Sequence, residues 1–181
     1  MLRWLLRRRI DAFEKAYEYD ASYMRYIMDV SLAAALKFGR IMGVANYRYD
    51  IPLDASFAAA LTTVLAEDCG PCSQLVVTMG EREGVAAATI KAVLAGDQRA
   101  MTPEAVLGYR FTQATLHHSP DADALRDEIV ARWGRRALVS LVFGIAAARV
   151  FPTLKYALGY GKSCSVIRVG GADTEVSRKA A

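Results

Sequence analysis

The hydrophobic and polar positions of this chain recur mostly at helical spacing. Ala and Leu are interleaved with Glu and Arg in segments that begin at capping residues and end at glycine or proline. Alternating runs of β-branched residues, which are typical of strands, are scarce. The pattern therefore predicts an all-α fold, without an internal repeat and without a linker that would divide the chain.

Capping residues at one end, and glycine or proline at the other, set the limits of the expected helices. Helices are expected at about residues 10–37 with a break near 20–22, at 55–67, from within 69–72 to 84, at 85–95, 103–118, 121–133, 135–149, and from after 152 to 160. Asp54 and Thr102 are predicted to be N-caps, and Pro103 suits the first position of a helix. Residues 43–53 are expected to form a loop.

Length and hydrophobic content favour one soluble domain. The chain has 181 residues, 54% of them hydrophobic, so residues 1–181 can share a substantial core. The longest apolar run, residues 137–148, is well short of the ~20 residues that span a bilayer, so we expect a largely buried helix there. Residues 1–9 cannot supply the apolar core of a secretory signal, and a cytoplasmic location follows.

The net charge of +4 comes from the N-terminus. Four arginines precede the first acidic residue, and the remainder holds 19 basic and 19 acidic side chains. No basic face with interleaved aromatics is evident, so nucleic-acid binding is not expected. We interpret residues 1–9 as a basic arm that packs on a partner subunit rather than on a membrane. Residues from about 169 to 181, with two adjacent glycines and alternating charges, are expected to be a flexible tail.

Two of the three cysteines form the motif Cys69-Gly70-Pro71-Cys72. A structural zinc site needs four ligands, usually in two pairs. The other candidate ligands, which do not form a second pair, are His117, His118 and Cys164. We therefore expect neither a metal nor another cofactor, and we interpret Cys164 as a semi-exposed thiol near the tail.

A reversible dithiol suits this motif better than a metal site. A Cys-x-x-Cys sequence at a helix start brings two sulfurs within disulfide reach, and the helix dipole lowers the pKa of a thiol there. The adjacent carboxylates of Glu67 and Asp68 could raise the pKa of the thiol by charge repulsion, or one of them could accept its proton. The structural alternative is that both acids only form the solvated end of a helix. His117 and His118 are more distant candidates for a proton relay, with a structural role as the alternative.

The run AEDCGPCSQLVVTMGEREGV, followed by a helix ending in VLAGD, resembles the carboxymuconolactone decarboxylase and alkylhydroperoxidase AhpD-like superfamily. The resemblance covers about residues 54–97. It implies an all-α bundle with the cysteine pair at a helix N-terminus, and homo-oligomers. Alkylhydroperoxidases of this superfamily carry Glu twelve residues before the first Cys and His four after the second. These positions are Phe57 and Val76 here, so the proton relay of the family is absent.

The resemblance implies a thiol-dependent hydroperoxide reductase or disulfide oxidoreductase that uses Cys69 and Cys72. Its substrates would be a small hydroperoxide and a thiol or protein electron donor. The second cysteine attacks in the family, whereas helix-start geometry favours Cys69 as the more exposed sulfur, so both assignments stay open. The alternatives are a non-enzymatic redox-sensing or interaction protein and a lyase of the decarboxylase type. A stripe of aromatic residues, Tyr17, Tyr23 and Tyr26, is expected to pack in the core.

Overall fold

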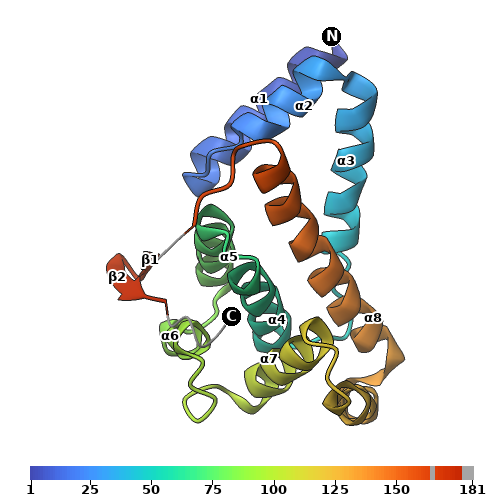
Figure 1. Cartoon of the computed structure of the whole chain (residues 1–181), viewed down its shortest axis with the longest axis vertical. Helices are drawn as coiled ribbons and strands as arrows, with labels where there is room; N and C mark the ends of the chain where they lie inside the picture. Colours follow the sequence, from blue (N-terminus) through green and yellow to red (C-terminus); the bar gives the residue numbers. More distant parts are fainter. Residues whose placement is uncertain (164–165, 177–181) are drawn as a thin grey trace.

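Eight helices and one short β-hairpin make up the part of the chain that the computed structural model describes, residues 1–163 and 166–176 (Figure 1). The helices are α1 (Leu2–Tyr17), α2 (Ser22–Val30), α3 (Leu32–Ala45), α4 (Leu53–Ala66), α5 (Gly70–Glu83), α6 (Ala87–Ala95), α7 (Pro103–Leu116) and α8 (Asp121–Ala157). The strands are β1 (Val166–Val169) and β2 (Ala172–Glu175). The predicted all-α character is confirmed, with the hairpin as an addition.

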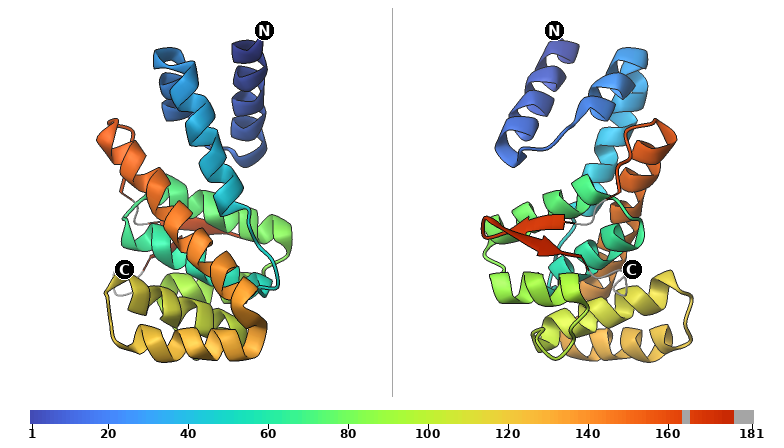
Figure 2. Two further views of the ribbon diagram at one scale, coloured as in Figure 1. Left: turned by 90° about the vertical axis from the view of Figure 1, so that its right-hand side faces the viewer. Right: turned by 60° about the vertical axis from the view of Figure 1, so that its left-hand side comes forward.

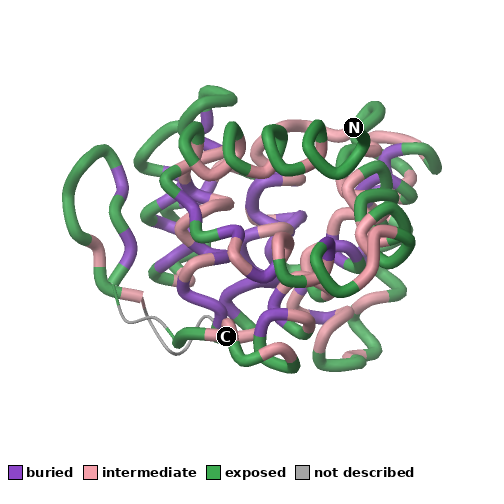
Figure 3. The backbone as a smooth tube through the Cα atoms, turned by 90° about the horizontal axis from the view of Figure 1, so that it is seen from above, coloured by how far each residue is buried: buried purple, intermediate pink, exposed green. Residues whose placement is uncertain are grey.

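Helix α4 is the centre of the bundle and packs against α5, α6, α7 and α8. Its alanines let neighbouring helices approach closely. A Cβ atom at Gly108 of α7 would lie only 2.4 Å from the carbonyl oxygen of Ala55, so the α4–α7 crossing requires glycine. Seen from above, the buried residues gather in the interior and exposed ones cover the N-terminal helices (Figure 3).

Helices α1, α2 and α3 form a layer in the upper part of both views, above helices α4 to α7 (Figure 2). Ser31, in an extended conformation, separates α2 from α3, and its hydroxyl accepts a hydrogen bond of 3.2 Å from the backbone N–H of Ala34. A chain of edge-on aromatic contacts joins this layer to α8. It runs through Phe13, Tyr19, Tyr23, Phe38 and Phe151.

The N-terminal half differs from the expected helix limits in several places, and α3 continues to Ala45, into the segment 43–53 that was expected to be a loop. Helix α1 begins at Leu2, so the basic residues 1–9 are the first turns of a regular helix. The break near residues 20–22 is present, but a second break at Ser31 was not expected. The N-cap expected at Asp54 is wrong, because α4 begins at Leu53 and its N-cap is Pro52, two residues earlier. The Asp54 carboxylate instead accepts a hydrogen bond of 2.8 Å from the Thr102 hydroxyl and ties α4 to α7.

Helix α8 covers the three helices expected between residues 121 and 160. The expected boundary between residues 133 and 135 is confirmed as a kink at Gly134, where φ is 85° and the backbone is not helical. The stop expected at Pro152 is wrong, because the helix continues through this buried proline. The expectation that its apolar segment is largely buried is wrong, because Val139, Val142 and Phe143 are exposed. Among the described helices, α8 alone is long and apolar enough to cross a membrane, and about a third of its most apolar window is buried. Core helices of soluble proteins pass the same test.

The β-hairpin occupies part of the segment that was expected to be a flexible tail. Strands β1 and β2 pair antiparallel across Gly170 and Gly171, whose φ values of 60° and 78° suit a tight hairpin turn. Ile167 and Val169 are buried in the main core. The side chain of Gln74 in α5 bonds both backbone groups of Arg168, at 3.1 and 2.8 Å. The tail prediction is therefore wrong for residues 169–175; residues 177–181 and Cys164 lie outside the described residues.

Candidate functional site

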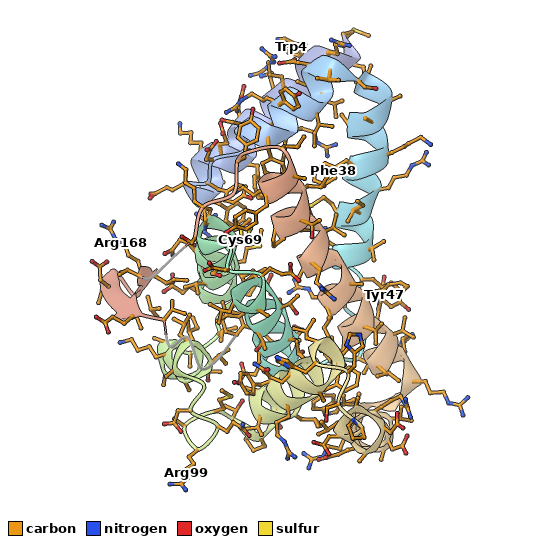
Figure 4. The ribbon with its side chains drawn as sticks, viewed as in Figure 1. Trp4, Phe38, Tyr47, Cys69, Arg99 and Arg168 are labelled. Atoms are coloured by element: carbon orange, nitrogen blue, oxygen red, sulfur yellow. A yellow bond between two sulfur atoms is a disulfide. The ribbon has the colours of Figure 1, made fainter. Side chains whose placement is uncertain are left out.

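The cysteine pair lies where α4 ends and α5 begins, at the labelled Cys69 in Figure 4. The chain reverses through Asp68, which has a left-handed φ of 48°, and Cys69 is extended at the N-cap of α5. Cys72 lies in the first turn of α5 after Pro71, which has no N–H to lose there. The two cysteines are joined as a disulfide, with their Cα atoms 5.2 Å apart.

Both sulfurs are withdrawn from the surface, but they face different surroundings. The exposed fraction is 1% for Cys69 and 4% for Cys72. The expectation that Cys69 is the more exposed sulfur is therefore wrong. Cys72, unlike Cys69, is one of the residues that line a neighbouring cavity. A small molecule in that cavity reaches the pair through Cys72.

The cavity beside Cys72 has a volume of about 200 Å³ and lies between α4, α5, α8 and the N-terminal helices. Its walls are mainly apolar, with contributions from Met42, Met79, Leu141 and Phe151. Phe57 and Val76, the two positions noted in the sequence for their missing Glu and His, also line it. The site is thus a small apolar chamber with a redox-capable sulfur in its wall.

The two acids next to the motif lie outside this chamber. The Glu67 carboxylate accepts a hydrogen bond of 2.7 Å from Nε of Arg149 in α8. Asp68 is exposed, and its backbone carbonyl accepts a hydrogen bond of 2.7 Å from the Tyr156 hydroxyl. Neither residue lines the cavity. Both therefore hold the α4–α5 turn against α8 instead of facing Cys72 from the cavity.

The structure does not bring the two histidines to the cavity. His117 ends α7, with Nδ1 2.8 Å from the carbonyl oxygen of Gln113, and His118 follows with a left-handed φ of 54°. Both are exposed in the turn between α7 and α8, and neither lines the cavity. Their contacts are those of a helix end.

Glu83 is the acidic residue that does share the cavity with Cys72, and the sequence analysis missed it. Cys72, Val76, Met79 and Glu83 line the cavity at the spacing of one face of α5. The Glu83 carboxylate pairs with both terminal nitrogens of Arg48, at 2.6 and 2.7 Å, and this pairing raises the pKa of Arg48. The helical spacing from Cys72 was the signal that could have revealed it.

Tyr19, Tyr23 and Lys155 form a second polar group that the sequence analysis did not assign to the site. Lys155 Nζ donates to the Tyr19 hydroxyl at 3.0 Å and lies over both aromatic rings, 4.4 and 5.3 Å from their centroids. Burial lowers the pKa of Lys155, raises that of Tyr19 to about 12, and raises that of Tyr23 as well. Both tyrosines line the cavity. The expectation of core packing is confirmed for Tyr23 but wrong for Tyr26, which is exposed.

Within residues 1–163 and 166–176, no three His, Cys, Asp or Glu side chains come together as a metal site. Comparison with known proteins adds no assignment. No protein-family model, curated protein or solved structure matches this chain.

Proposed function

We propose that this protein is a thiol-dependent hydroperoxide reductase of the AhpD-like type. The observation that carries the proposal is the placement of Cys72, which is paired with Cys69 at the start of α5 and lines an apolar cavity. The cavity offers a small organic hydroperoxide a mainly apolar site beside Cys72. We assign the attack on the peroxide to Cys72 and the resolving role to Cys69.

The reaction begins with the reduced pair. The Cys72 thiolate attacks the terminal oxygen of the hydroperoxide, the O–O bond breaks, and the alcohol leaves with a proton. Cys72 is then a sulfenic acid. The Cys69 thiol attacks its sulfur, water leaves, and the disulfide forms. Two thiols of an external donor then restore the dithiol and leave as the donor's disulfide, so that two electrons pass from donor to peroxide in each cycle.

The first turn of α5 favours the thiolate that this cycle requires. Cys72 lies within the first turn of a helix of 14 residues, where the positive end of the dipole stabilises an anion. The backbone N–H of Gly70 donates to the carbonyl of Lys162 at 3.0 Å and anchors the start of the helix. The pair is thus held rigidly, which keeps the two sulfurs within reach of each other.

The positions of Phe57 and Val76 support the resemblance and also limit the chemistry. In the alkylhydroperoxidases the corresponding positions carry the proton-relay Glu and His, and here both side chains line the cavity beside Cys72. The relay is replaced by apolar walls. Glu83 is the carboxylate left in the cavity wall, and it is paired with Arg48 at the opposite end of α5 from Cys72.

A second candidate function follows from this replacement. Without the relay, the dithiol reacts with a disulfide more readily than with a peroxide, because thiol–disulfide exchange needs no proton for a departing alkoxide of high pKa. The protein would then be a disulfide oxidoreductase or a redox sensor. Exposed Val139, Val142 and Phe143 on α8 support association into homo-oligomers in either case.

The test is hydroperoxide consumption by the reduced protein, with free thiols counted before and after. Cumene hydroperoxide is compared with hydrogen peroxide, and oxidised glutathione serves as the alternative oxidant. We expect the wild type to consume cumene hydroperoxide and to lose two thiols per chain. Cys72→Ser should consume none, whereas Cys69→Ser should react once and then stop.

The matched control is Cys164→Ser, which removes the remaining cysteine and should leave turnover intact. Rapid loss of two thiols to oxidised glutathione with negligible peroxide consumption would favour the second candidate. Retention of all thiols with every oxidant would exclude both.

A further inference from the structure

Lys155 is a buried cation without a carboxylate partner among residues 1–163 and 166–176. Its exposed fraction is 1%, and its Nζ donates one hydrogen bond, to the Tyr19 hydroxyl. Two charged groups act on Lys155 through space: Asp20 raises its pKa and Lys162 lowers it. Asp20 is exposed, and its carboxylate accepts from the N–H of Ser22. Buried charges are normally paired, so the surroundings of Lys155 favour the arrival of an anion.

Two tyrosines connect this cation to the cavity. Lys155 Nζ lies over the rings of Tyr19 and Tyr23, and both side chains line the cavity. The Tyr19 oxygen accepts from Lys155, so its own proton is available for donation. The Tyr23 hydroxyl is fully buried and makes no hydrogen bond of normal length within the described part of the chain, while burial and then the neighbouring Tyr19 hydroxyl raise its pKa. Such a hydroxyl is unusual in proteins, and an acceptor bound in the cavity would satisfy it.

The remainder of the cavity suits an aliphatic chain. Met24, Leu75, Met79 and Phe151 line it. The charged side chains in its wall, Arg48 and Glu83, are already paired with each other. Its volume of about 200 Å³ is below the range of about 300–1,000 Å³ of drug-sized sites, so the ligand is a small molecule.

We propose that this cavity is a binding site for a small aliphatic carboxylate. The Tyr19 and Tyr23 hydroxyls donate to the carboxylate, Lys155 supplies the counter-charge through Tyr19, and the chain lies along the apolar walls toward Cys72. This site does not depend on redox turnover. It exists in the disulfide form that the structure shows, so its test and the test of the proposed function are independent.

The experiment is calorimetric titration of the oxidised full-length protein with octanoate, and with 1-octanol and octylamine as head-group controls. We expect octanoate to bind at least tenfold more tightly than 1-octanol and octylamine not to bind. Tyr23→Phe removes a single hydroxyl and should weaken octanoate about ten- to hundredfold while leaving 1-octanol nearly unchanged. Tyr17→Phe is the matched control, because Tyr17 does not line the cavity.

Two further variants test the charge and the chamber. Lys155→Met should remove the preference for octanoate over 1-octanol. Gly144→Leu should abolish binding of both, because Gly144 lines the cavity and a Cβ atom there meets no atom within 4 Å, so the leucine can enter the space. Gly144→Leu and Tyr23→Phe keep the proposal testable even if Lys155→Met does not fold.

Equal affinity for octanoate and 1-octanol in the wild type would overturn the carboxylate site and leave an unspecific apolar chamber. Binding of octanoate that is unaffected by Gly144→Leu would place the ligand elsewhere. Absence of any heat of binding with both compounds would overturn the proposal as a whole.

Discussion

The Glu67 carboxylate lies 2.7 Å from Nε of Arg149, and this contact joins the residue two positions before Cys69 to the long helix α8. The contact explains why Glu67, although close to the cysteine pair in sequence, is not part of the cavity wall. The carboxylate that does line the cavity, Glu83, lies at the far end of α5 on the same helix face as Cys72. Proximity to the cysteine pair in sequence and a place in the cavity wall are therefore different properties in this fold.

The first prediction concerns these two acids. Glu67→Gln should leave the rate of Cys72 oxidation by cumene hydroperoxide within about twofold of the wild type, because Glu67 holds Arg149 and does not face the cavity. Glu83→Gln should also leave it within about twofold, because the rise of about 1.5 Å per helical residue places Glu83 roughly 16 Å from Cys72 along α5, beyond the reach of a general base. Stopped-flow measurement of thiol loss in the reduced protein gives both rates.

Arg48→Met is the control for the second of these variants, because it frees Glu83 without removing its carboxylate. It should leave the rate unchanged. A rate lowered tenfold or more by either Gln substitution would mean that a carboxylate reaches Cys72 in solution and would contradict this prediction.

A second prediction concerns the α4–α7 crossing. Gly108→Ala should destabilise the protein by about 1–3 kcal/mol or more, because the new methyl group would lie 2.4 Å from the Ala55 carbonyl oxygen and backbone atoms must move. Gly39→Ala, in an exposed position of α3 with no atom within 4 Å of the new Cβ, should stabilise by up to about 1 kcal/mol. Urea denaturation of the two variants measures the contrast. Similar effects of both substitutions would contradict the close approach.

Local signals explain which elements could be predicted. The Thr102 hydroxyl caps α7 by accepting from Ala105 N–H at 3.3 Å, and Gly84 and Gly96 end α5 and α6 with φ values of 94° and 67°. These residues act within one turn of their own position, so sequence alone reveals them. Pro152 misled the prediction of α8, because a proline is tolerated inside a helix when neighbouring elements pack around it.

The cavity could not be predicted, because its walls come from segments that tertiary packing brings together. Lys155 and Tyr19 form a hydrogen bond across 136 residues of sequence, and no local pattern relates them. The part of the wall formed by α5 was the exception. Cys72 and Glu83 lie on the same face of this helix, and their spacing in the sequence could have indicated it. The hairpin was missed because four-residue strands carry little alternation, although the adjacent glycines 170 and 171 were a hairpin signal.

The third prediction tests the hairpin. Ile167→Ala should destabilise the protein by about 2–5 kcal/mol, because Ile167 is fully buried in the main core cluster. Val166→Ala changes the neighbouring, exposed position of the same strand and should cost less than about 0.5 kcal/mol. Thermal denaturation followed by circular dichroism measures both. A flexible tail predicts equally small effects, so near-equal melting temperatures would remove the hairpin from the fold in solution.

The fourth prediction follows from the pKa of Tyr19, which burial raises to about 12. Above the ordinary value near 10, the unfolded tyrosine loses its proton while the folded one keeps it, so the native state binds more protons and stability falls as pH rises. Stability linked to this group is therefore complete below about pH 10 and is lost between pH 10 and 12. Tyr19→Phe has no such group. Since both proteins retain Lys155, the wild type should lose about 2–3 kcal/mol relative to the variant across this window, and nothing between pH 7 and 9. Urea denaturation at closely spaced pH values gives the difference, and parallel curves up to pH 12 would mean that the Tyr19 hydroxyl is solvated in solution.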